Sequence, residues 1–195
     1  MVSMKKLLFT RESACIQPIR ELIEQQNHRT LVLWALDSAS FALNIFESRS
    51  DDLRPRQAVE AAGLWASGSI KMPDAKKAIL ACHKAATESG SDPVTEAAAR
   101  AVGHAAATVH VETHALGLVF YGLTAAAYAK CPYTMPNDAE ALVADELDWF
   151  YERLTYWEIH AEDKKRSWAP FLLKDSPNKE KLFRQKQEQK MKNKV

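Results

Sequence analysis

The chain has 195 residues, of which 47% are hydrophobic and 26% charged, so it is neither globally disordered nor too small to bury a core. Its formal net charge of +1 is unevenly distributed: residues 178–195 carry seven Lys or Arg against two Glu, a net +5, which leaves −4 for the rest. Proteins dedicated to nucleic acid line a folded face with basic residues, so an acidic body with a basic tail argues against nucleic acid as a partner.

Turn-rich linkers separate apolar segments with helical spacing, and no stretch shows the period of two that marks a strand. Four of these segments begin near a proline, which suits the first turn of a helix, and Asp92 before Pro93 is expected to be an N-cap. In chain order the predicted helices span residues 18–26, 30–47, 55–67, 74–88, 93–129 and 139–168, and the tail from residue 179 is helix-prone. The sequence predicts an all-α fold: a single helical domain of about six to seven helices over residues 1–175 and a mobile or helical basic tail over residues 176–195.

The segment 97–129 is the most distinctive part of the chain, because it is rich in alanine and contains no proline. Alanine is the best helix former, and its small side chain lets neighbouring helices approach closely. We therefore expect a central helix, or two helices meeting at a bend, around which the other helices pack.

If this segment is one unbroken helix, a turn of about 100° per residue aligns His110, His114, Tyr121 and Tyr128 on one polar stripe. Two histidines four residues apart can ligate one metal ion, and an inward-facing His83 would supply a third ligand. The interpretation that we favour is structural: buried polar side chains, among them His104, hydrogen-bond across a helix interface. On that interpretation no cofactor is expected, and a divalent metal is the alternative.

The sequence HVETH, residues 110–114, differs from the zinc-protease motif, in which Glu directly follows the first His. Glu112 would project about 200° away from His110 on a helix. It is therefore not expected to act as the base for a metal held by the two histidines.

Several polar or aromatic residues are candidates for partner binding. Arg54 and Arg56 lie within the predicted helix start RPRQ. They can pair with Asp51, Asp52 or Asp37, or with a carboxylate of a partner. Asp37 shares a polar helical face with Ser40 and Asn44. Trp149 and Tyr156 lie off the apolar stripe of the predicted 139–168 helix and are therefore candidates for exposure. The candidate binding residues are Asp37, Arg54, Arg56, Trp149 and Tyr156.

The three cysteines are far apart and lack zinc-site spacing, which indicates a reducing compartment. The apolar run near the start is too short for a signal peptide, and residues 115–129 are too few for a membrane span. We expect a cytoplasmic protein without membrane association.

Three segments resemble a known family: LWALDSA at residues 33–39, RPRQAVEAAGLWASG at 54–68, and GHAAATVHVETHALG at 103–117. In this order they are similar to the Imm-five-like immunity proteins of bacterial polymorphic toxin systems. The resemblance implies an all-helical, non-enzymatic protein that protects its producer by binding a cognate toxin, and it transfers no catalytic residue. Family-like positions are occupied by Asp37, Arg54, Arg56, His104, His110 and His114.

Three hypotheses about function follow. The first is a protein that neutralises a cognate toxin by direct binding. The second is a helical metalloprotein or hydrolase that uses the histidine stripe, and the third is a scaffold that forms a homo-oligomer.

Overall fold

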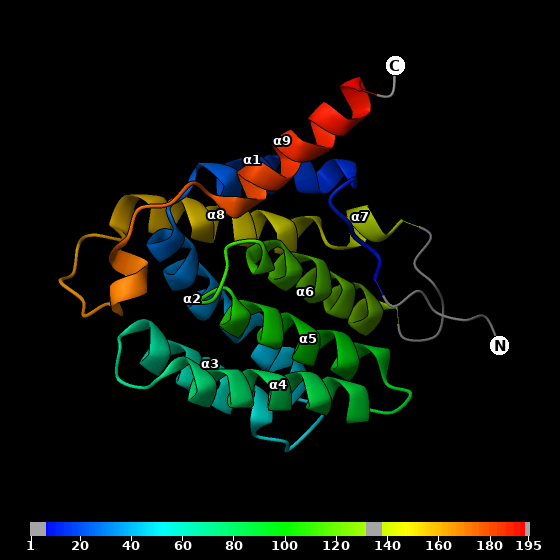
Figure 1. The fold of residues 1–195 in the computed structure, drawn as a ribbon. Coiled ribbons are helices and arrows are strands. Elements are labelled where there is room, and N and C mark those ends of the chain that lie inside the picture. Colours follow the sequence, from blue (N-terminus) through cyan, green and yellow to red (C-terminus); the bar gives the residue numbers. More distant parts are fainter. Residues whose placement is uncertain (1–6, 132–137, 194–195) are drawn as a thin grey trace.

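The described residues of the computed structural model, 7–131 and 138–193, form helices and no strand, which confirms the predicted all-α fold (Figure 1). Within these ranges there are nine α-helices and two short 3-10 helices, Ala14–Ile16 and Pro170–Leu173. The α-helices are α1 (Gln17–Gln25), α2 (His28–Glu47), α3 (Arg54–Ala66), α4 (Met72–Glu88), α5 (Pro93–Ala107), α6 (His114–Lys130), α7 (Ala139–Leu142), α8 (Ala144–His160) and α9 (Lys179–Lys192). None of the helices in these ranges combines the length and apolarity needed to cross a membrane.

The helix starts follow local chemistry that the sequence displays. A proline occupies one of the first two positions of α1, α3, α4 and α5, where its missing N–H costs nothing. The Asp92 side chain accepts hydrogen bonds from the backbone N–H groups of Val94 and Thr95, at 3.1 and 3.4 Å. This confirms Asp92 as the N-cap of α5.

The alanine-rich segment is central, as predicted. α5 packs against α2, α3, α4 and α6, and most of its residues are buried. A helix that contacts four others needs small side chains on all sides, and α5 meets this need with alanines such as Ala98, Ala101 and Ala105, each fully buried. Figure 1 shows the α3–α4 hairpin on one side of the α5–α6 hairpin.

The segment is two helices rather than one, because the chain reverses over residues 108–113 and α6 packs back on α5. No Gly or Pro marks this reversal, but four of its six residues, TVHVET, are β-branched and therefore weaker helix formers than the alanines before them. His28 Nε2 lies 2.7 Å from the carbonyl oxygen of Thr108, which ties the reversal to the start of α2.

The prediction of one helix over residues 139–168 is wrong in its extent: the segment contains the short α7 and then α8, which ends at His160. The buried side of α8 carries Phe150 and Leu154, both fully buried. The next positions on that side after Ala161 are Lys164 and Lys165, so a helix continued through them would turn two charged side chains toward the buried side.

The first turn of α9 is attached to α1. Asn178 caps α9 and donates hydrogen bonds from Nδ2 to the carbonyl oxygens of Ile23 and Gln26, at 2.8 and 3.0 Å. Glu180 is fully buried and accepts two hydrogen bonds from the Arg11 guanidinium, at 2.8 and 2.9 Å. These contacts hold the start of the basic tail against the helical body.

Candidate functional site

Histidines from three elements come together beside the α5–α6 reversal. His83 lies on α4, His104 on α5, and His114 is the first residue of α6. The Nδ1 atoms of His104 and His114 are 3.1 Å apart, and the ring centroids of His83 and His104 are 5.6 Å apart. The His104 ring also stacks on Tyr121 of α6, with centroids 5.2 Å apart and planes 14° apart. We call these four residues the histidine cluster.

The histidine cluster replaces the continuous stripe that an unbroken helix would have formed. His110 lies in the reversal rather than on α6, so it does not share a helical face with His114. Its ring instead stacks against Trp65 of α3, with centroids 6.1 Å apart. Tyr128 is buried on α6, seven residues beyond Tyr121. The packing of α5 on α6 therefore places His104 next to His114, whereas the helical pattern in the sequence had predicted His110 there.

Two glycines make room for the imidazole rings. A Cβ atom built on Gly103 of α5 would lie 2.5 Å from Cε1 of His83, and one built on Gly117 of α6 would lie 2.5 Å from Cγ of His104. A Cβ atom essentially never approaches a non-bonded heavy atom this closely, so any larger residue at either position would displace the ring. Each ring thus fills the space left by a missing side chain on the neighbouring helix.

The environment of the histidine cluster favours neutral rings. Burial, with further contributions from His114 and His83, lowers the pKa of His104 to about 3. Burial also lowers the pKa values of His83 and His114 below the usual value. A neutral imidazole has one N–H donor and one acceptor, so one Nδ1 of the His104–His114 pair donates to the other.

The described ranges contain no group of three or more His, Cys, Asp or Glu side chains placed to hold a metal ion. A catalytic zinc site typically uses three protein ligands, and the His104–His114 pair supplies two facing nitrogens. Glu112 is 1% exposed, and its carboxylate lies 3.8 Å from His28 Nδ1 and 3.9 Å from Lys179 Nζ. A divalent metal at the histidines stays a prediction.

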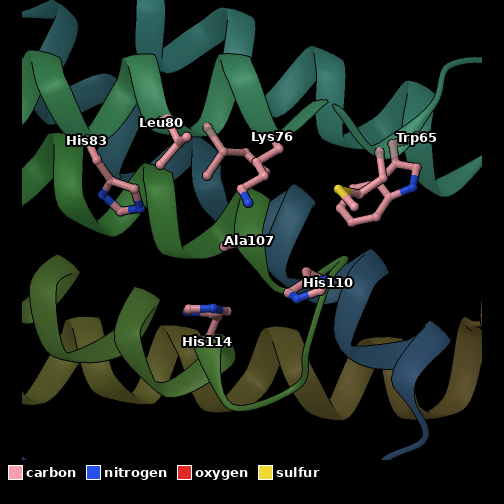
Figure 2. Close-up of a pocket in the computed structure, with 9 residues that line it drawn as sticks. Trp65, Lys76, Leu80, His83, Ala107, His110 and His114 are labelled. Atoms are coloured by element: carbon pink, nitrogen blue, oxygen red, sulfur yellow. The ribbon is translucent and has the colours of Figure 1, made fainter. Parts of the chain in front are cut away.

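A pocket of about 260 Å³ opens next to the histidine cluster, between α3, α4 and the reversal (Figure 2). Its polar lining residues are Lys76, His83, His110 and His114. Its apolar lining residues are Trp65, Met72, Ile79, Leu80 and Ala107. We call it the Trp65 pocket. The sequence analysis did not single out Lys76 or Trp65, because the pocket forms only where α3 and α4 meet the reversal.

The two arginines of the RPRQ segment are engaged within the protein. Arg54 pairs with Asp52 at 2.5 Å and with Glu88 at 2.7 Å, which joins the start of α3 to the end of α4. Arg56 pairs with Glu47, at the end of α2, at 2.6 Å. Asp52 was among the expected partners, whereas Glu88 and Glu47 were not.

The other three candidate binding residues lie along the contact between α2 and α8. Asp37 accepts hydrogen bonds from Arg153 and from Trp157 Nε1, the latter at 2.8 Å. The Arg153 guanidinium lies 5.2 Å from the ring centroid of Tyr156. Trp149 is half-buried against Phe41 of α2, with centroids 5.6 Å apart, and Tyr156 is 45% exposed. Of the five candidates, Tyr156 offers the most accessible aromatic surface.

The outer side of α8 carries a set of residues of which the sequence analysis singled out Tyr156 alone. We call it the α8 ridge. Its three carboxylates are exposed and form no ion pair with any other residue that the structure describes. The side chains of Tyr156 and Ile159 are 45% and 67% exposed. The ridge consists of Asp145, Asp148, Glu152, Tyr156 and Ile159. Their steps of three and four residues, opposite the buried side of α8, are a signal that the sequence contains.

Most of the chain is similar to a known protein family. The family described as "Imm-5 like putative immunity protein" matches residues 21–156, from within α1 to near the end of α8. No curated protein and no solved structure matches the chain.

Proposed function

The chain belongs to the Imm-5 like family of immunity proteins, and on this premise we propose that it neutralises a cognate toxin by binding it directly. Family membership favours a binding protein over an enzyme. An inhibitor of this kind needs a surface complementary to the toxin and no catalytic group of its own.

The α8 ridge is the observation that supports this proposal most directly. Three carboxylates without an ion-pair partner among the described residues lie beside an exposed Tyr and an exposed Ile. Protein interfaces gain most of their affinity from a few aromatic and apolar anchors, whereas charges accelerate the encounter and select the partner. The ridge therefore fits a toxin surface that is basic around an apolar patch.

The arginines at the start of α3 fit the role less well. Arg54 and Arg56 already hold Asp52, Glu88 and Glu47, so a partner carboxylate would have to displace an existing ion pair. The carboxylates of the ridge need no such displacement.

The test uses the full chain and the protein product of the neighbouring reading frame, which is where the proposal expects the toxin. Calorimetry and stopped-flow association are measured for the wild type, for Glu152→Lys on the ridge, and for the matched control Glu60→Lys on the exposed side of α3. We expect a stoichiometric complex whose association rate falls about ten-fold in Glu152→Lys, less so at high salt, and is unchanged in the control.

Two outcomes would contradict the proposal. Absence of any complex with the neighbouring product would reject direct neutralisation. A complex that Glu152→Lys and Glu60→Lys affect equally would reject the α8 ridge as the binding surface.

A further inference from the structure

We propose that the Trp65 pocket binds a small aromatic carboxylate. The pocket lies between α3, α4 and the reversal and shares no residue with the α8 ridge. The proposal therefore does not depend on toxin binding.

The size of the pocket sets the size of the ligand. Its volume of about 260 Å³ exceeds the roughly 150 Å³ of a cavity that holds benzene and lies just below the range of drug-sized sites. The space suits one or two fused rings with a short side chain. Most of the lining is apolar, so the body of the ligand must be apolar as well.

The rings of Trp65 and His110 favour a flat ligand. Their planes are 25° apart, and Trp65 also packs on Phe171 with centroids 5.3 Å apart. Trp65 is 7% exposed, so its position is fixed before any ligand arrives. An aromatic ring entering the pocket would lie against these rings, and aromatic pairs are stabilised in offset-stacked or edge-to-face arrangements.

The charge of the lining selects an anion. Figure 2 shows the Lys76 side chain extending from α4 into the space between His83 and His110, above Ala107. Lys76 forms no ion pair with any residue in the described ranges, and no Asp or Glu is among the lining residues that those ranges provide. Its ammonium group therefore faces the pocket without a counter-charge.

The number of donors favours a carboxylate over a phosphate. His83 and His114 are kept neutral by burial and can each donate one hydrogen bond at most. A phosphate carries up to two charges and several acceptor oxygens, which a single lysine beside apolar walls satisfies poorly. One carboxylate on an aromatic body matches one ammonium beside an aromatic wall.

The test is calorimetric titration of the full chain with indole-3-acetate and 3-phenylpropanoate. Tryptamine, which carries the same ring with an ammonium group, and 3-methylindole, which has no charge, are the ligand controls. Lys76→Met removes the charge and keeps an unbranched side chain. The matched control is Lys77→Met, which is also exposed on the same helix but lies outside the pocket lining.

We expect one carboxylate molecule to bind per chain. Its affinity should be about ten-fold weaker for Lys76→Met than for the wild type and unchanged for Lys77→Met. Leu80→Trp, at a position that is 57% exposed and therefore tolerant of a larger residue, should block binding by filling the pocket. The proposal is overturned if neither carboxylate binds, if tryptamine binds as tightly as indole-3-acetate, or if Lys76→Met and Lys77→Met behave alike. None of these measurements involves the toxin, so failure here is distinct from failure of the proposed function.

Discussion

Substitution of Gly117 by Ala tests the packing of the histidine cluster most directly. The new methyl group would lie 2.5 Å from Cγ of His104, so the ring must move or the α5–α6 hairpin must open. Overpacking of this kind costs about 1–3 kcal/mol. Movement of His104 also breaks its hydrogen bond with His114, at a cost of about 1 kcal/mol.

The higher helix propensity of alanine opposes this cost, with a gain of about 1 kcal/mol. The net expectation for Gly117→Ala is a decrease of about 1–3 kcal/mol in the free energy of unfolding. Gly63 is the matched control, because it also lies within a helix, α3, and a Cβ atom there meets nothing within 4 Å. Gly63→Ala should therefore raise the free energy of unfolding by about 0.5–1 kcal/mol.

The assay is urea unfolding followed by circular dichroism at pH 7.5, with midpoints compared at a common slope. A double-mutant cycle with His104→Ala adds the decisive step, since Gly117→Ala should lose most of its cost once the ring is removed. If Gly117→Ala is as stable as Gly63→Ala, or if its cost persists without the His104 ring, the proposed steric role of Gly117 is refuted.

Three further predictions concern pH, capping and the tail. The pKa of His104 is about 3 in the folded protein and about 6.5 in the unfolded chain. The unfolded state therefore takes up a proton as the pH falls below about 6.5, and the free energy of unfolding decreases by about 2 kcal/mol by about pH 5. The difference between urea midpoints at about pH 7.5 and 5.0 should be smaller in His104→Gln than in the wild type, and an equal difference would contradict this. Asp92→Ala should lower the free energy of unfolding by about 1–2 kcal/mol, because the first N–H groups of α5 lose their acceptor, and an unshifted urea midpoint would speak against the cap. Glu180→Ala removes the carboxylate that pairs with the Arg11 guanidinium and so weakens the attachment of α9 to the helical body. In limited proteolysis, cleavage within α9 should therefore come sooner than in the wild type, while the helical body persists. A wild-type cleavage pattern would show that other contacts hold the tail.

Local features of the sequence determined the class of the fold and most of its helices. Helical spacing of apolar residues placed Phe150 and Leu154 on the buried side of α8, and the pair Asp92–Pro93 marked the start of α5. These signals are readable because helix formation and capping depend on residues three or four positions apart. The alanine content of α5 likewise indicated a helix that others surround.

Tertiary structure decided the position of the reversal and everything that depends on it. No Gly or Pro marks residues 108–113, and the chain turns there because α6 buries its apolar surface against α5. That packing, and not helical periodicity, pairs His104 with His114 and places His110 on Trp65.

The partner of Asp37 illustrates the same limit. It is Arg153, 116 positions later in the chain, and the two meet only because α8 packs on α2. A helical wheel orders residues within one helix and carries no information about which face of another helix lies opposite. The sequence by itself therefore determined the all-α class and most of the helices, whereas the long-range packing of those helices decided which polar side chains meet.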